Sequence, residues 1–150
     1  MERYDLRTSF QPDLAGLHVR IATPPERLPR ADVVDRAREI ASETGGSVLV
    51  THDLTEAVAG ARVVATDTWV SMGDATSTAE AEALFGPFQL DQAVLDLAAP
   101  DAIVLHCLPA YRGKEITAEV LDGPQSVVFD EAENRLHAQK ALLTFLLGRA

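Results

Sequence analysis

Short runs of Val, Ile and Leu recur along the chain, and segments with helical periodicity separate them. Five runs have the length and the flanking turn residues of β-strands: 17–22, 46–51, 61–66, 101–106 and 125–130. Helices are predicted at roughly 31–44 (with Gly45 as its C-cap), 53–59, 77–84, 90–98, 117–121 and 131–148. This alternation predicts an α/β fold with three αβα layers, a Rossmann-like arrangement whose doubly wound, mainly parallel sheet carries helices on both faces.

The first thirteen residues depart from this pattern. They hold only scattered apolar side chains, whereas a doubly wound domain normally opens with its central, most buried strand. In the usual strand order 3-2-1-4-5, the runs 17–22 and 61–66 would flank that central position. We therefore expect an atypical segment at 1–13, a domain at 14–150, and two unpaired strand edges. Such edges would leave the isolated chain marginally folded, prone to aggregate or dependent on a partner's strand.

Composition narrows the classes of function. A length of 150 residues, 47% of them hydrophobic, suits one domain with its own core. A formal net charge of −10 without a Lys/Arg cluster argues against nucleic acid or an anionic membrane surface as a partner. The apolar runs are too short to span a bilayer, and no GxGxxG motif indicates a dinucleotide cofactor. With one cysteine and no signal-like N-terminus, we expect a cytoplasmic protein.

The stretch HCLPAYRG stands at the carboxyl end of the fourth run, where doubly wound sheets bind ligands. One interpretation is structural: His106 and Cys107 end a buried strand, and Pro109 terminates it. The other is functional, because a thiol beside an imidazole and near Arg112 would lie in electropositive, partly open surroundings that favour the thiolate. Pro109 would also leave the carbonyl groups of Cys107 and Leu108 free to accept a bond from a ligand amine.

Two further stretches follow strand ends. In DTWVSMG, Trp69 and Met72 could simply anchor a loop, but Asp67 could also hold a cationic amine while Ser71 offers a hydroxyl group. In DEAENR, Arg135 could pair with a glutamate one helical turn earlier, or reach a carbonyl or phosphate oxygen over the sheet edge. The remaining histidines are scattered, so no metal site is assigned.

Together, DTWVSMG, HCLPAYRGKEIT and FDEAENRLHAQKALL resemble the second, ornithine-binding domain of the ornithine carbamoyltransferase family. The resemblance extends from about Leu14 to the C-terminus. It implies a transferase of arginine biosynthesis, which moves a carbamoyl group from carbamoyl phosphate to the δ-amine of L-ornithine and yields citrulline and phosphate. It implies no metal or organic cofactor.

The resemblance also implies roles for individual residues. Asp67 would bind the α-amino group of ornithine, and Ser71 and Met72 would close over its backbone end. Cys107 would lie beside the δ-amine, and Arg135 would hold the carbonyl oxygen of carbamoyl phosphate; these two are the expected catalytic residues. The residues expected to bind the substrates are Asp67, Ser71, Met72, Cys107, Leu108 and Arg135. His106 and Arg112 are expected to support them.

The sequence also differs from the family pattern. The paired asparagines expected at the start of the domain are absent from MERYDLRTSF, and Asp74 and Ala75 replace the usual Gln-Glu after SMG. The STRTR and HPxQ segments of the carbamoyl-phosphate domain do not occur in the 150 residues. We therefore expect a fragment that is inactive alone and meets carbamoyl phosphate only if another chain supplies a first domain. A homo-oligomer is left open.

Two alternatives differ in class. A non-catalytic amino-acid-binding or regulatory module would use the same pocket without chemistry. A flavodoxin-like signalling domain would use Asp53 or Asp67 as an acceptor, but the acidic cluster and the lysine that such a domain needs are missing from the expected strand ends.

Overall fold

A computed structural model describes residues 16–70 and 77–148. The expected segment 1–13 and the expected ligands Ser71 and Met72 lie outside these ranges. The described elements are β1 His18–Ala22, η1 Pro25–Arg27, α2 Ala31–Thr44, β2 Ser47–Thr51, α3 Leu54–Val58, β3 Val63–Thr66, α4 Thr78–Phe85, η2 Gly86–Phe88, α5 Gln92–Leu95, β4 Ile103–His106, α6 Ala118–Leu121 and α7 Val128–Leu146. The predicted α/β alternation is confirmed.

The strands form two parallel pairs. β1 pairs with β2 from His18↔Ser47 onwards, and β3 pairs with β4 up to Thr66↔His106. No ladder joins β1 to β3 within residues 16–70 and 77–148, so each of these strands is paired on one side only. This arrangement agrees with the predicted strand order, in which a central position separates the two.

The prediction of a fifth strand at 125–130 is wrong. Ser126 makes only an isolated parallel bridge to Val104, and backbone bonds of 2.8 and 3.0 Å tie Val104 to the residues on either side of Ser126. Helix α7 then begins at Val128. Two acidic residues in its first turn favour the helix, because carboxylates stabilise the positive end of the helix dipole.

Local sequence signals explain the helix boundaries. The apolar residues of α2 recur at helical spacing, and Gly45 ends the helix in the left-handed conformation (φ 82°) with its N–H bonded to the Ala41 carbonyl. Asp53 caps α3 by accepting two backbone N–H groups. Ser77 and Glu80 form a capping box at the start of α4. Because these caps fix where each helix begins or ends, the strand ends beside them hold defined positions.

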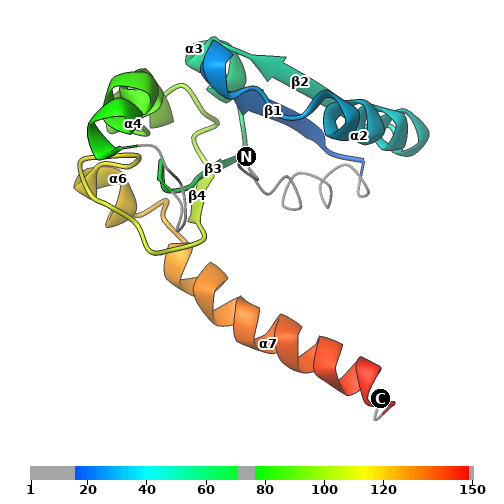
Figure 1. The fold of residues 1–150 in the computed structure, drawn as a ribbon. Coiled ribbons are helices and arrows are strands. Elements are labelled where there is room, and N and C mark those ends of the chain that lie inside the picture. Colours follow the sequence, from blue (N-terminus) through cyan, green and yellow to red (C-terminus); the bar gives the residue numbers. More distant parts are fainter. Residues whose placement is uncertain (1–15, 71–76, 149–150) are drawn as a thin grey trace.

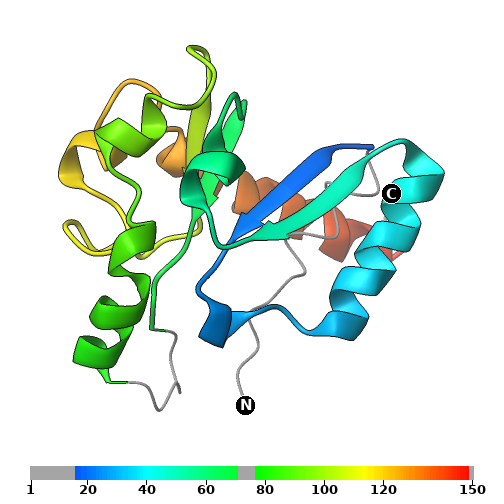
Figure 2. The same cartoon turned by 90° about the horizontal axis from the view of Figure 1, so that it is seen from above.

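The hydrophobic core lies on the side of β3 and β4. Its buried members come from α3, β3, β4, α5, α6, the start of α7 and the isolated bridge between Leu90 and Ile116: Val58, Val64, Leu90, Leu95, Val104, Ile116, Val120, Leu121 and Val128. Helix α2 lies along one face of the β1–β2 pair, whose side chains are only half-buried or exposed (Figure 2). Helix α3 packs against β1 and β2 on one side and against α5 on the other.

Helix α7 extends away from the rest of the molecule (Figure 1). Its first residue, Val128, is fully buried and contacts the core, and the remaining turns carry exposed apolar side chains. These exposed residues are Phe129, Leu136, Leu142, Leu143, Phe145 and Leu146. Within the described ranges, every helix is too short or too polar to cross a membrane.

Candidate functional site

The carboxyl ends of β3 and β4 bring two predicted site residues together. Thr66 and His106 are register partners in the parallel ladder, so the residues that follow them, Asp67 and Cys107, leave the sheet side by side. The Cys107 Sγ–H group donates a hydrogen bond to Oδ1 of Asp67 at 3.0 Å. Oδ1 also accepts the backbone N–H of Thr68 at 2.6 Å. A carboxylate and a thiol therefore share one edge of the sheet.

The surroundings of the Cys107 thiol are electronegative. Partial burial of the sulfur, the hydrogen bond to Asp67 and the negative charges of Asp67 and Glu131 together raise the pKa of Cys107 to about 12. The expectation of a thiolate in electropositive surroundings is therefore wrong. Arg112 does not face the thiol but pairs with Asp122 through two bonds of 2.6 and 3.0 Å. At neutral pH Cys107 is a protonated thiol.

His106 is fully buried, and its backbone N–H and both ring nitrogens have partners. Its backbone N–H donates to Oε2 of Glu131 at 2.9 Å. Its ring Nδ1 accepts the backbone N–H of Leu108 at 2.9 Å, and Nε2 lies 3.2 Å from Oε1 of Glu115. The same Oε1 accepts the N–H of Tyr111 at 2.6 Å. The strand end that carries Cys107 is thus held by two glutamates.

Leu108 adopts an unusual backbone conformation. Its φ of 52° lies in the left-handed region, which a leucine enters at a cost of about 1 kcal/mol or more. The bond from its N–H to His106 helps to hold this conformation.

Arg135 stands apart from this cluster. It is exposed on α7, and no hydrogen bond or ion pair joins it to Asp67, Cys107 or Glu131 in the described part of the chain. The alternative in which Arg135 pairs with Glu131 is therefore not observed, because Glu131 bonds to His106 instead. The guanidinium group is accessible to a ligand.

Asp67, His106 and Cys107 have ligand atoms within 4.8 Å of one another, the spacing of a metal-ligand group. However, His106 already engages both ring nitrogens, and Cys107 holds its proton against Asp67. A metal ion would have to displace one of the ring bonds and the thiol proton.

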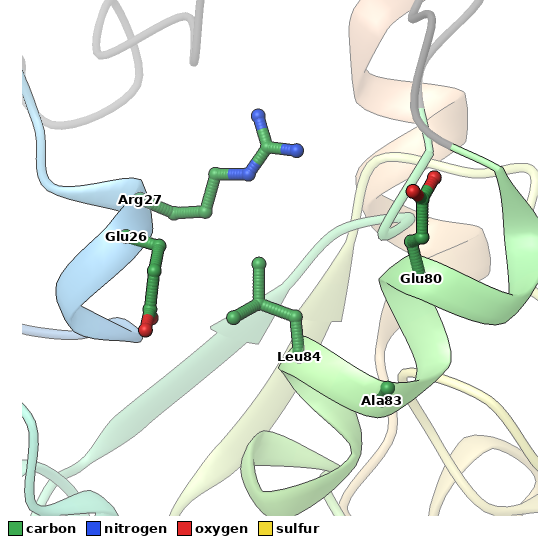
Figure 3. Close-up of a pocket in the computed structure, with 5 residues that line it drawn as sticks. All are labelled: Glu26, Arg27, Glu80, Ala83 and Leu84. Carbon is green, nitrogen blue, oxygen red and sulfur yellow. The ribbon is translucent and has the colours of Figure 1, made fainter.

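A shallow depression of about 570 Å³ lies between η1 and α4, away from this cluster. Figure 3 shows Arg27 and Glu80 on its opposite sides, with Leu84 between them. The pKa of Glu80 is lowered, first by the hydroxyl and backbone of Ser77 and to a smaller extent by the charge of Arg27. None of the predicted site residues lines this depression.

Sequence reasoning found Asp67, Cys107, His106 and Leu108, and the structure brings these four together. It missed Glu115, whose carboxylate is buried, and the contact of Glu131 with the strand end. A glutamate directly before the buried Ile116 was the available signal, because a charged residue within a buried segment requires bonding partners.

The sequence matches a family model over residues 12–146, that of the Asp/Orn-binding domain of aspartate/ornithine carbamoyltransferase. It is 63% identical to an ornithine carbamoyltransferase from Renibacterium salmoninarum over 136 residues, which are 91% of this chain and 44% of that protein. Identity to an ornithine carbamoyltransferase from Bifidobacterium longum is 60% over 137 residues, 91% of this chain and 43% of that one.

Solved structures point to the same family as the sequence matches. The chain matches an ornithine carbamoyltransferase from Pyrococcus furiosus with a TM-score of 0.83 and 45% identity, covering 88% of this chain and 42% of that one. An N-acetyl-L-ornithine transcarbamylase matches with a TM-score of 0.78 and 31% identity, covering 90% and 42%. The chain thus spans less than half the length of these relatives.

Proposed function

The chain belongs to the aspartate/ornithine carbamoyltransferase family through the Asp/Orn-binding domain, and on that premise we propose that it is the ornithine-binding half of an ornithine carbamoyltransferase. In this proposal residues 14–150 form the ornithine-binding domain. The reaction transfers the carbamoyl group of carbamoyl phosphate to the δ-amine of L-ornithine and releases phosphate. The relatives from Renibacterium salmoninarum and Bifidobacterium longum are named ornithine carbamoyltransferases and are more than twice as long as this chain. Their greater length supports assigning the carbamoyl-phosphate site to a separate first domain.

The contact between Asp67 and Cys107 carries the proposal. Ornithine brings two amines, and a carboxylate at the end of β3 offers the counter-charge that an ammonium group needs. Because the Cys107 thiol donates to Asp67, its sulfur lone pairs remain available to accept an N–H of the ligand. In this proposal Asp67 binds the α-amino group, and Cys107 lies beside the δ-amine that attacks the carbamoyl group. The attacking δ-amine must lose a proton, which the Asp67–Cys107 pair beside it helps to accept.

The remaining assignments extend this site. The Leu108 carbonyl accepts a bond from the same amine, and Ser71 and Met72 cover the α-carbon end of ornithine. Arg135 holds the carbonyl oxygen of carbamoyl phosphate, as a guanidinium group suits an oxygen that gains negative charge. Exposure of Arg135 on α7 supports this role, because no internal partner among the described residues occupies it.

Binding of L-ornithine to the 150-residue chain tests the proposal. Calorimetric titration should show weak affinity, on the order of millimolar, because the missing asparagine pair removes hydrogen bonds to a charged group that are each worth about 1.5–3 kcal/mol. Asp67→Ala should abolish binding. Asp96→Ala is the matched control, because Asp96 is an exposed residue whose carboxylate accepts a hydrogen bond from the Gln92 side chain.

Two results would contradict the proposal: micromolar affinity, or an Asp67→Ala variant that binds ornithine as well as the Asp96→Ala control. We also expect the chain alone to form no citrulline above background from ornithine and carbamoyl phosphate. Steady turnover by the purified chain would show that the division of labour between two domains is wrong.

A further inference from the structure

Glu115 is a buried carboxylate that the proposed reaction does not use. Its side chain is 1% exposed, and Oε1 accepts two hydrogen bonds, from the N–H of Tyr111 at 2.6 Å and from the ring of His106 at 3.2 Å. Oε2 has no partner among the described residues. Burying a carboxylate is unfavourable unless its bonds compensate, and leaving one oxygen unpaired increases that cost. The cost points to a role beyond filling the core.

The bonds around His106 determine where its ring proton lies. A backbone N–H can only donate, so the Leu108 N–H requires an unprotonated Nδ1 on His106. The proton of the neutral ring is therefore on Nε2, and it points at Oε1 of Glu115. A carboxylate on one ring nitrogen fixes the tautomer and orientation of a histidine, as in the second shells of metal and catalytic sites.

The fixed ring in turn shapes the strand end. Leu108 has a φ of 52°, and its N–H finds its acceptor only in the Nδ1 of the preceding histidine. The peptide between Cys107 and Leu108 is thereby oriented, and the thiol reaches Asp67 at 3.0 Å. If Nδ1 carried the proton, the Leu108 N–H would face a second donor, and this turn would lose its support.

We propose that Glu115 is a positioning residue: it holds His106 in the Nε2–H tautomer, and so keeps Cys107 and Leu108 in the geometry that places the thiol against Asp67. The inference deepens the proposed function and rests on it only for the identity of the ligand. Its tests use the resting chain without ornithine, so they can fail independently of that function.

The first test measures the tautomer directly. Nitrogen NMR of the ¹⁵N-histidine-labelled chain at about pH 8, where an ordinary histidine is neutral, should show a His106 ring with protonated Nε2 and unprotonated Nδ1. An Nδ1–H tautomer or an imidazolium ion at that pH would overturn the proposal. This measurement needs no variant.

The second test follows the thiol. Cys107 is the only cysteine in the sequence, so its alkylation rate by iodoacetamide is unambiguous. In Glu115→Ala, loss of the acceptor should release the ring and separate the thiol from Asp67, and the rate at pH 8.5 should rise about tenfold for each unit by which the thiol pKa falls. Glu115→Gln keeps an oxygen acceptor for Nε2–H and should stay within about threefold of the wild type.

Glu119→Gln is the matched control, because Glu119 is an exposed glutamate on α6. It should leave both the tautomer and the alkylation rate unchanged. Two results would overturn the proposal. One is a folded Glu115→Ala chain that keeps the wild-type tautomer and alkylation rate. The other is an alkylation rate that is raised in Glu115→Ala and equally raised in Glu115→Gln. If Glu115→Ala does not fold, the wild-type tautomer and a wild-type rate in Glu115→Gln decide in favour. A chain with the expected tautomer that fails to bind ornithine would support the positioning role and contradict the proposed function.

Discussion

The two strand pairs have the same parallel geometry but very different surroundings. In the second pair, β4 is bonded to β3 on one side and to residues 125–127 on the other, and Val104 is completely buried. In the first pair, β1 and β2 have each other as their sole ladder partners among residues 16–70 and 77–148, and their side chains are half-buried or exposed. The site residues Asp67 and Cys107 follow β3 and β4. The difference teaches that the site is built on the better-packed half, where precise placement is easier to maintain.

The short helix α3 connects the two halves. Arg20 of β1 donates to the carbonyl groups of Glu56 and Ala59 at 3.1 and 2.8 Å, so the first pair holds the carboxyl end of α3. On its other side, α3 contributes Val58 to the core. Because the side chains of β1 and β2 are less buried, we expect the first pair to open locally more easily than the second, which the following experiments test.

The largest expected effect comes from core truncation. Ile116 is completely buried, so Ile116→Ala should lower the free energy of unfolding by about 3–4 kcal/mol, whereas Ile21→Ala in the half-buried β1 should cost only about 1 kcal/mol. Urea denaturation measures both losses. Equal losses would mean that the two halves are equally well packed, and the comparison would fail.

Amide hydrogen exchange sharpens the same comparison without a substitution. Amides of residues 104–106 should exchange about 100-fold more slowly than those of residues 19–22, because opening of the first pair does not require global unfolding. The sample must be dilute and shown to be monomeric. Equally strong protection of residues 19–22 and 63–66 would show that the edges of β1 and β3 are covered, contrary to the expectation from strand order.

A smaller effect concerns the thiol within the better-packed half. Burial and the Asp67 carboxylate both raise the pKa of Cys107, and Asp67→Asn removes the second cause, so this pKa should fall from about 12 towards its ordinary value. Alkylation at pH 9 should then be about tenfold faster for each unit of decrease. The control is Asp96→Asn, which removes the same negative charge from an exposed carboxylate and should leave the alkylation rate unchanged.

The raised pKa also predicts a pH dependence. Between about pH 9 and about pH 12 the unfolded chain has lost the thiol proton while the folded chain retains it, so the stability from the neutral thiol is complete below pH 9 and lost as pH rises to 12. Asp67→Asn should flatten this decline in urea titrations. A decline that is equally steep in the variant would show that Asp67 does not control the thiol.

The smallest effect is expected at Arg112. The arginine pairs with Asp122 at the surface, and both side chains are about half exposed. Arg112→Ala should change neither the alkylation rate of Cys107 nor the ornithine affinity beyond experimental error, since surface ion pairs contribute little. A clear change in either would restore the supporting role that the sequence suggested for this residue.

The sequence placed Asp67 and Cys107 at the carboxyl ends of two predicted strands, and the structure brings the two residues together because the carboxyl ends of neighbouring parallel strands share one edge. It failed where nearby charges compete for partners. Arg112 stands five residues after Cys107 but pairs with Asp122, and only the fold brings Asp67 and Glu131 to the thiol. The run 125–130 failed for another reason: β propensity in Val127 and Val128 lost to a helix start favoured by acidic residues.

Helix α7 acts mechanically as a lever on the site. Its first turn is fixed to the strand end, because Glu131 accepts the N–H of His106 and Val128 is buried in the core. The 19 residues of the helix span about 28 Å. A rotation of about 5° at its base would therefore displace the last turn by about 2.5 Å. A change of geometry beside Cys107 is thus magnified at the apolar end near Phe145. A surface that binds this end would in turn restrict the angle between α7 and the strand end.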